Sequence, residues 1–471
     1  MKKIRRLVLI LGLVMVLVLG LSGCAKDESP LDPDHPTTVR LWHYYNGATK
    51  ERFDALVNTF NETVGMEKGI VVDAMTQGDV QQLADAVFAA ANETIGSQPL
   101  PDIFAAYPDN AFRVNQIKPL VDMGSYFSEE EISDFREEFV AEGAFGEEGK
   151  FLIIPVAKSS ENLYLNKTFW DQFAGETGAT LDQLATWEGV LEVSKLYYDW
   201  SGGKAFISID SAPNFFLITA MQMGQEAYRY GEDGTASLTY DEAMAKKHWE
   251  YFYEPYLMGY YKKLGRFSSD DAKVGNVIAY TGSTAGATYF PTQVTLENGE
   301  VFDVESAALP YPYFADGSKI AVQQGAGMCI LKSDEAHEYA AAAFLKWFTM
   351  PEQNLQFAVA TGYFPVMDEA LTSDGILEAL NTVNTEGVSP TVIASVKTTT
   401  QMFEAYKLYG NRPFYGSYEM RILFEKSMFE FAQDKLQRIQ AGEDMSDYLG
   451  DETFNEWYNE FIKSSELILT P

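Results

Sequence analysis

The chain is poor in cysteine and histidine, the residues that most often build disulfides, zinc sites and redox centres. Its 471 residues include two cysteines and four histidines, and neither type is grouped in the sequence. This spacing excludes CxxC redox motifs and Cys/His metal motifs. The sequence motifs of phosphate-binding loops, serine hydrolases and zinc proteases are absent too. We therefore expect no metal, no cofactor and no catalytic residues, and a protein that is not an enzyme.

Basic residues are scarce compared with acidic ones. Lys and Arg number 35 against 68 Asp and Glu, which gives a formal net charge of -33. A field of this sign repels nucleic acids and anionic lipid headgroups, so we expect neither as a partner. The acidic residues are scattered rather than blocked, a pattern typical of a solvated surface. Chance carboxylate pairs are therefore no evidence for a glycosidase.

The apolar run at residues 7–21 is too short to cross a bilayer, because it has 15 residues and a spanning helix needs about 20. It follows a basic start, Lys2-Lys3-Ile4-Arg5-Arg6, and ends in Leu21-Ser22-Gly23-Cys24. This order is typical of a secretory signal peptide, and its end resembles a bacterial lipobox. We expect residues 1–23 to be removed and Cys24 to carry a lipid that anchors an exported protein to the cell membrane. The alternative is an ordinary signal peptide with an incidental cysteine.

The segment after the signal peptide differs from the rest of the mature chain. It is rich in proline and acidic residues and nearly free of apolar ones, so we expect residues 24–36 to be a flexible acidic tether. If Cys24 is lipidated, Cys329 has no disulfide partner, and its apolar neighbours favour a small core residue. The remaining chain is too long for one ordinary core and predicts two domains.

Strand and helix patterns alternate in the first part of the mature chain. Strands are expected at residues 38–43, 69–75 and 101–106, separated by helices at 50–63 and 81–92. This order predicts a parallel sheet covered by helices, with ligands beyond the carboxyl ends of its strands. A second alternating unit follows residues 151–156. We expect its strands at 162–165, 277–280 and 327–331, and helices at 180–200, 241–262, 334–349, 351–360, 412–440 and 446–462.

Aromatic and polar residues gather at two of these strand ends. Trp42, His43, Tyr44, Tyr45 and Asn46 close the first strand, and Tyr107 and Asp109 follow the third. A sugar site needs flat apolar faces for the rings and fixed polar groups for the hydroxyls, so these residues are ligand candidates. The alternative is that Trp42 belongs to the core and the tyrosines to the surface.

Four segments, in order, resemble the family of extracellular solute-binding proteins that includes the maltose- and glycerol-phosphate-binding proteins. They are Thr37 to His43 with Phe53 to Asn61, Pro101-Asp102-Ile103, Ile154 to Lys167, and Gly325 to Met328 with Ala341 to Met350 and Thr361 to Val366.

The resemblance implies an α/β fold of two lobes that clamp a ligand in a cleft and are joined by three crossings. We place the crossings near residues 154–157, 280–283 and 325–328. The N-terminal lobe is then 37–154 plus 283–326, and the C-terminal lobe is 157–280 plus 328–471. The implied function is that of a monomeric substrate-binding lipoprotein that delivers a solute to the permease of an ABC importer.

The resemblance also implies ligand positions. Ser159 or Ser160, Ser283, Gly325, Tyr363 and Arg421 fall where the glycerol-phosphate branch holds its ligand. Glu161 follows the first crossing and Thr284 the second, while Arg412 is a second candidate for binding an anion. The alternatives are purely structural roles: Glu161 caps a turn, Tyr363 packs in the core, and Arg421 pairs with a neighbouring carboxylate.

The sequence departs from the glycerol-phosphate pattern at two positions. Val80 and Pro108 stand where that branch has a tyrosine and a glutamate. We therefore expect a mono- or oligosaccharide ligand, with glycerol 3-phosphate or its diesters as the alternative. Rival interpretations from other classes are an exported carbohydrate-active hydrolase and a surface adhesin.

Overall fold

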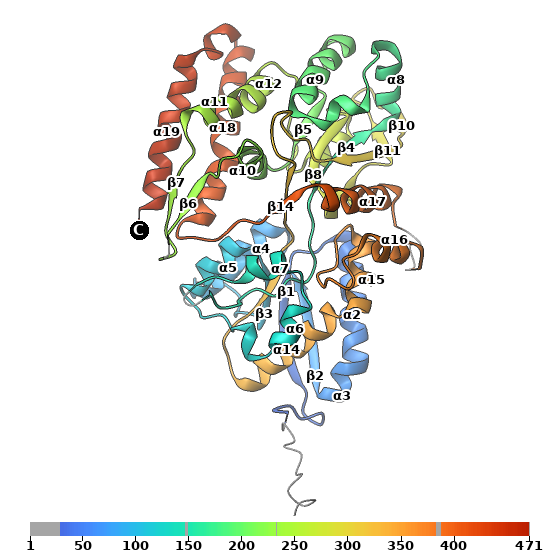
Figure 1. Ribbon diagram of the computed structural model, residues 1–471, viewed down its shortest axis with the longest axis vertical. Helices are drawn as coiled ribbons and strands as arrows, with labels where there is room; N and C mark the ends of the chain where they lie inside the picture. Colours follow the sequence, from blue (N-terminus) through green and yellow to red (C-terminus); the bar gives the residue numbers. More distant parts are fainter. Residues whose placement is uncertain (1–28, 147–148, 232, 383–387, 471) are drawn as a thin grey trace, which may run out of the picture.

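The computed structural model describes residues 29–146, 149–231, 233–382 and 388–470. The expected signal peptide and Cys24 lie outside these residues. Figure 1 shows two lobes stacked along the long axis, with blue, cyan and orange segments in the lower lobe and green, yellow and red segments in the upper one. We call them the first and the second lobe.

The first lobe is built on a four-stranded sheet with the order β13 (Gly327–Ile330), β3 (Ile103–Ala106), β1 (Thr37–His43) and β2 (Ile70–Thr76). β2 and β3 run parallel to β1, and β13 is antiparallel to β3. Helices α2 (Gly47–Phe60) and α4 (Val80–Ala91) connect the parallel strands. The predicted opening β-α-β-α-β unit is confirmed.

The apolar stripe of the first helix explains how it packs. Phe53, Leu56, Val57 and Phe60 recur at helical spacing, and all four are buried in the core of the first lobe. Asp79 begins α4, because its side chain accepts a hydrogen bond from the backbone N–H of Gln82 in a capping box.

The second lobe has its own four-stranded sheet, in the order β11 (Ser306–Pro310), β4 (Glu161–Asn166), β8 (Ala279–Ser283) and β5 (Ile207–Ile209). Every residue of β4 is buried, because helices and loops cover both faces of this central strand. The main helices of this lobe are α8 (Lys167–Thr177), α9 (Trp187–Ser201), α10 (Ala212–Gln222), α17 (Pro390–Ala405), α18 (Ser417–Gln440) and α19 (Asp451–Leu469).

The expected division of the chain after β8 is wrong. Residues 283–326 were assigned to the first lobe, yet β11 pairs with β4 of the second lobe. Residues 328–471 were assigned to the second lobe, yet β13 pairs with β3, and α14 (Glu335–Thr349) and α15 (Pro351–Thr361) pack in the first core. The chain stays in the second lobe after β8 because β11 fills the free edge of β4.

Three segments cross between the lobes in the described part of the chain, and they lie side by side. Backbone bridges join Ile154 to Met328, Ser159 to Gln324, and Lys158 to Phe364. Two of the predicted crossings fall here, whereas the one expected at 280–283 is the buried strand β8. Gly325 is required at this point, because its φ is +101° and a Cβ atom would lie 2.4 Å from the carbonyl oxygen of Ala157.

Two smaller expectations concern the tether and Cys329. Of the predicted tether, residues 29–36 are described, and Leu31 is partly buried against the first core, so this end is packed rather than free. Cys329 is fully buried in β13, and burial raises the pKa of its thiol, so the predicted core role is confirmed.

Candidate functional site

A cavity of about 680 Å³ lies between the lobes and is lined by residues of both. The first lobe contributes Tyr44, Tyr45, Asn46, Thr49, Asp79, Val80, Gln81, Tyr107 and Tyr363, and the crossings contribute Ser159 and Gln324. The second lobe contributes Asp210, Arg266, Phe267, Ser269, Asp270, Lys273, Tyr280, Gly282, Ser283, Ala285, Gly286, Tyr289, Arg421 and Glu425. We call this space the cleft.

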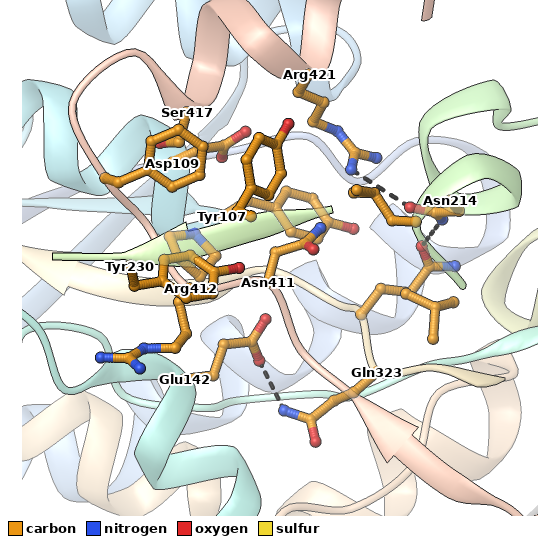
Figure 2. A pocket seen from close by; sticks show the side chains of 16 residues that line it. Tyr107, Asp109, Glu142, Asn214, Tyr230, Gln323, Asn411, Arg412, Ser417 and Arg421 are labelled. Carbon is orange, nitrogen blue, oxygen red and sulfur yellow. Dashed lines mark hydrogen bonds between the residues drawn. The ribbon is translucent and has the colours of Figure 1, made fainter. Parts of the chain in front are cut away.

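A narrower cavity of about 50 Å³ continues from the cleft, since both are lined by Tyr107, Gln324 and Arg421. Figure 2 shows this side pocket, whose lining includes Tyr230, Arg412, Asp109, Glu142 and Asn411. The guanidinium of Arg412 lies 5.0 Å from the ring centre of Tyr230.

Tyrosines dominate the first-lobe wall of the cleft. The hydroxyl groups of Tyr44 and Tyr363 lie 3.2 Å apart and share a hydrogen bond. Tyr45 packs against Phe357 and Tyr363, and its buried hydroxyl has no hydrogen-bond partner among the described residues. Burial raises the pKa of all three phenols, so they remain neutral donors and acceptors at physiological pH.

The second-lobe wall adds exposed aromatic faces. Phe267 and Tyr289 are 47% and 44% exposed, so their rings are open to a ligand in the cleft. Tyr280, from β8, is buried, and its hydroxyl also has no partner among the described residues. The cleft therefore offers flat rings and unsatisfied hydroxyls on opposite walls.

The charges that line the cleft are nearly balanced and mostly paired. Arg266 forms an ion pair with Asp79, and Lys273 lies 3.2 Å from Asp270. Arg421 is the lining cation without a carboxylate ion pair among the described residues, and it donates a hydrogen bond to Asn214 Oδ1 at 3.3 Å (Figure 2). Burial raises the pKa of Glu425, the acidic residue that α18 contributes to the cleft.

The lobes also touch each other directly beside the cleft. Arg113 of the first lobe is held between two rings, 4.0 Å from the ring centre of Phe88 and 3.6 Å from that of Tyr418 of the second lobe. The Tyr418 hydroxyl bonds with Gln81 and donates to Asp85 at 3.2 Å. Together with the Asp79–Arg266 pair, these contacts join the two lobes directly beside the cleft.

Most of the residues proposed from the sequence do meet at the cleft. Tyr44, Tyr45, Asn46, Tyr107, Ser159, Ser283, Tyr363 and Arg421 line the main cavity, and Asp109 and Arg412 line the side pocket. The Asn46 amide donates to the carbonyl groups of Tyr44 and Gly78, so this side chain shapes the wall of the cleft. A ligand role for each of these residues stays a prediction.

Six of the proposed residues line neither cavity, so the prediction that each of them contacts a ligand gains no support from the lining. Trp42 and His43 are core residues of β1, Ser160 and Glu161 are buried behind the crossing, and Gly325 shapes the backbone there. Burial lowers the pKa of His43 to about 4, so its ring is neutral and accepts a hydrogen bond from the backbone N–H of Tyr45. Thr284 is also buried away from the lining.

Several residues of the cleft were not proposed from the sequence, among them Asp79, Asp210, Arg266, Phe267, Tyr280 and Gln324. Phe267 lies in a loop between Leu264 and Ser268, where no periodic pattern marks it. Tyr280 was assigned to a strand, but the residues around its side chain are fixed only by the strands that pair with β8, which the local sequence does not show. In the sequence these residues are marked only by an arginine beside a phenylalanine after Gly265.

No group of metal-ligating side chains is found in the described part of the chain. Likewise, none of the helices within the described ranges is both long and apolar enough to cross a membrane.

Solved structures share this fold at low sequence identity. The cyclic α-maltosyl-1,6-maltose binding protein of Arthrobacter globiformis is 19% identical, with a TM-score of 0.65 over 92% of this chain and 99% of that chain. UgpB of Mycobacterium tuberculosis, in complex with glycerophosphocholine, is 17% identical, with a TM-score of 0.67 over 92% and 99%. The maltotriose binding protein of Thermus thermophilus is 14% identical, with a TM-score of 0.63 over 91% and 99%.

No curated protein sequence matches the chain. The family model of bacterial extracellular solute-binding proteins, however, matches residues 55–381, which span most of both lobes. The chain therefore belongs to the family of bacterial extracellular solute-binding proteins, whose members are binding proteins that share this two-lobed α/β fold.

Proposed function

We propose that this chain is the substrate-binding lipoprotein of an ABC importer, anchored through Cys24, that captures a carbohydrate between its lobes and delivers it to the permease. The family implies an exported protein that works with a permease, and the signal-like start of the sequence agrees with export. The ligand is a mono- or oligosaccharide, and no catalytic step is involved.

The observation that carries the proposal is the pair of unsatisfied hydroxyls of Tyr45 and Tyr280. Each belongs to a different lobe and to a residue that lines the cleft. A buried hydroxyl without a partner costs about 1–3 kcal/mol, so a solute that supplies partners to both gains stability only when the lobes are closed. A polyhydroxylated solute does this, and it also uses the exposed faces of Phe267 and Tyr289 for stacking.

The charges of the cleft support a neutral ligand over an anionic one. Arg266 and Lys273 are already paired with carboxylates, which leaves Arg421 to meet a phosphate. The negative field of the whole protein opposes an anion as well.

A glycerophosphodiester is the second candidate. Arg421 reaches both cavities, and a guanidinium fork suits a phosphodiester. The solved structure of UgpB with glycerophosphocholine has the same overall fold, so a glycerophosphodiester is the second candidate ligand to test.

The two candidates are separated by a thermal-shift panel of maltose, maltotriose, glycerol 3-phosphate and glycerophosphocholine. A ligand that binds only the folded state at 100 times its Kd stabilises it by about 2.7 kcal/mol. We expect a sugar to raise the unfolding midpoint, and the increase to be lost in Tyr363→Ala. A shift with the phosphates alone supports the second candidate, and no shift with any compound of a wider sugar panel contradicts carbohydrate binding.

A further inference from the structure

Arg421 is connected through Asn214 to a carboxyl group that lies outside the cleft. The amide nitrogen of Asn214 donates to Glu161 Oε1 at 2.5 Å and to Gln324 Oε1 at 3.0 Å. Its amide oxygen accepts from Arg421 Nη1 at 3.3 Å (Figure 2). Glu161 and Asn214 are only 3% and 2% exposed, so the arrangement is shielded from solvent.

The chemistry of the two ends dictates how Asn214 is oriented. An ionised carboxylate only accepts hydrogen bonds, and a guanidinium only donates them. The amide of Asn214 meets both requirements in one orientation alone, with its nitrogen toward Glu161 and its oxygen toward Arg421. When Glu161 takes up a proton, it can donate a hydrogen bond as well. The nitrogen of Asn214 then no longer has to point toward Glu161.

We propose that Glu161 and Asn214 are positioning residues that hold Arg421 at the cleft, and that protonation of Glu161 releases this hold and weakens solute binding. The inference rests on the proposed function in one respect, because Arg421 lines the cavity in which the solute is proposed to bind. It goes beyond the proposed function, because a buried carboxyl group that the ligand does not touch then affects how tightly the solute binds.

Charged and titratable groups approach Glu161 from each element around it. Asp210 comes from the turn before α10, and Arg421 and Glu425 come from α18. Tyr311 follows β11, and Tyr164 lies on β4 with Glu161 itself. Lys263 lies 3.9 Å from Glu425 and donates to the carbonyl oxygen of Asp210.

The balance of these groups allows Glu161 to titrate near neutral pH. Burial, as the largest effect, raises the pKa of Glu161 to about 7, although the hydrogen bond from Asn214 favours the ionised form. A carboxyl group with this pKa is about 90% ionised at pH 8 and about 10% ionised at pH 6. If binding needs the ionised form, the Kd rises up to about tenfold between these pH values.

The positioning is tested first without any ligand. The side-chain amide signals of Asn214, assigned by their loss in Asn214→Asp, are followed by ¹H–¹⁵N NMR from pH 5.5 to 8.5. We expect a shift with a midpoint near 7 that is absent in Glu161→Gln. Glu425→Gln is the matched control, because it removes a neighbouring buried carboxyl group and should keep the titration. A wild-type amide that does not titrate contradicts the proposal even if Glu161→Gln fails to fold, and so does a titration that persists in Glu161→Gln.

The effect on binding is measured by calorimetry with maltotriose and with glycerophosphocholine at pH 6 and pH 8. We expect weaker binding at pH 6 in the wild type and in Glu425→Gln, and no pH dependence in Glu161→Gln. Binding of either probe that is equally strong at both pH values overturns the proposal. If neither probe binds, the choice of solute fails, while the NMR titration still decides whether Glu161 orients Asn214.

Discussion

Tyr45 of the first lobe and Tyr280 of the second lobe line the same cleft, and the buried hydroxyl of each lacks a hydrogen-bond partner among the described residues. Buried polar groups are almost always satisfied in folded proteins. Among the buried polar atoms without a partner in the described residues, these two belong to tyrosines on opposite walls of one cavity, which is the arrangement expected of groups that a bound solute completes.

The first prediction concerns these two hydroxyls. Tyr45→Phe and Tyr280→Phe should each weaken binding of the solute by about 1 kcal/mol, the net value of one hydrogen bond, and leave the free protein no less stable. Isothermal calorimetry and thermal unfolding measure the two effects. Tyr261→Phe is the matched control, because its hydroxyl is also buried and unpartnered but lies outside the cleft. Equal affinities in all four proteins would mean that neither hydroxyl contacts the solute.

Local patterns were enough to predict the three parallel strands of the first lobe's sheet and the position of most of the cleft. The stripe from Phe53 to Phe60 and the short apolar strands form as expected, since their burial depends on neighbours within the same unit. Ligand candidates at strand ends, such as Tyr45 and Tyr107, were found for the same reason, because the carboxyl ends of parallel strands meet at one edge of a sheet.

Pairing between distant segments could not be predicted in this way. The assignment of β11 and β13 to the wrong lobes came from placing a crossing after β8, although nothing in the local sequence shows which edge strand completes a sheet. Trp42 and Glu161 illustrate the same limit at the level of single residues. Their side chains alternate toward the core rather than the cleft, and a shift of one residue along a strand reverses the face.

The second prediction concerns the direct contacts between the lobes. Tyr418→Ala removes the stacking of Arg113 and the hydroxyl contacts with Gln81 and Asp85, which together contribute about 1–2 kcal/mol to closure. The radius of gyration of the protein without solute should therefore increase in small-angle scattering. Tyr198→Ala, in α9 at the far side of the second lobe, should leave it unchanged. Identical scattering of both variants and the wild type would show that these contacts do not set the closed population.

The third prediction is a loss of stability in acid. His248 is fully buried, with the hydroxyls of Thr219 and Tyr240 each 2.8 Å from one ring nitrogen, and burial lowers its pKa to about 3. An unfolded histidine has a pKa of about 6.5, so below this pH the unfolded chain binds a proton that the folded protein does not bind. The stability that the neutral, buried His248 contributes is therefore complete above pH 6.5. It is lost as the pH falls toward 3, by about 1.4 kcal/mol per pH unit.

The thermal unfolding midpoint of the wild type should therefore decrease when the pH is lowered from 7 to 5. His248→Gln keeps the two hydrogen bonds without a titrating ring and should show a smaller decrease. His337→Gln, which replaces a partly exposed histidine beside Asp334, should behave as the wild type. If His248→Gln and the wild type lose stability in parallel, His248 is not the group responsible.

The fourth prediction concerns membrane attachment. Cys24→Ser removes the proposed site of lipidation and should move the protein from the membrane fraction to the soluble fraction, or leave the signal peptide uncleaved, without changing the fold. Fractionation and mass spectrometry of the N-terminus measure this. Cys329→Ser serves as a comparison, because it alters the other cysteine, which is buried in β13. An unmodified N-terminus elsewhere in the wild type contradicts the lipoprotein assignment.

The fifth prediction separates a neutral solute from an anionic one through Arg421. A sugar depends chiefly on ring faces, so Tyr363→Ala should weaken maltotriose binding by about 1–3 kcal/mol, as is typical of a central aromatic contact. Arg421→Ala should then cost about 1.4 kcal/mol, the tenfold change expected when the positioning of Arg421 is lost. A change from 50 to 500 mM salt should hardly alter the Kd, because no net charge is brought into the cleft. A phosphodiester reverses the relative importance of Tyr363 and Arg421.

Loss of the Arg421 guanidinium would leave the buried phosphate without its partner and cost several kcal/mol, and binding of the phosphodiester would weaken with salt. Calorimetry on both variants at both salt concentrations therefore identifies the class of solute. A large loss in Arg421→Ala together with a strong salt dependence would transfer the assignment to a glycerophosphodiester.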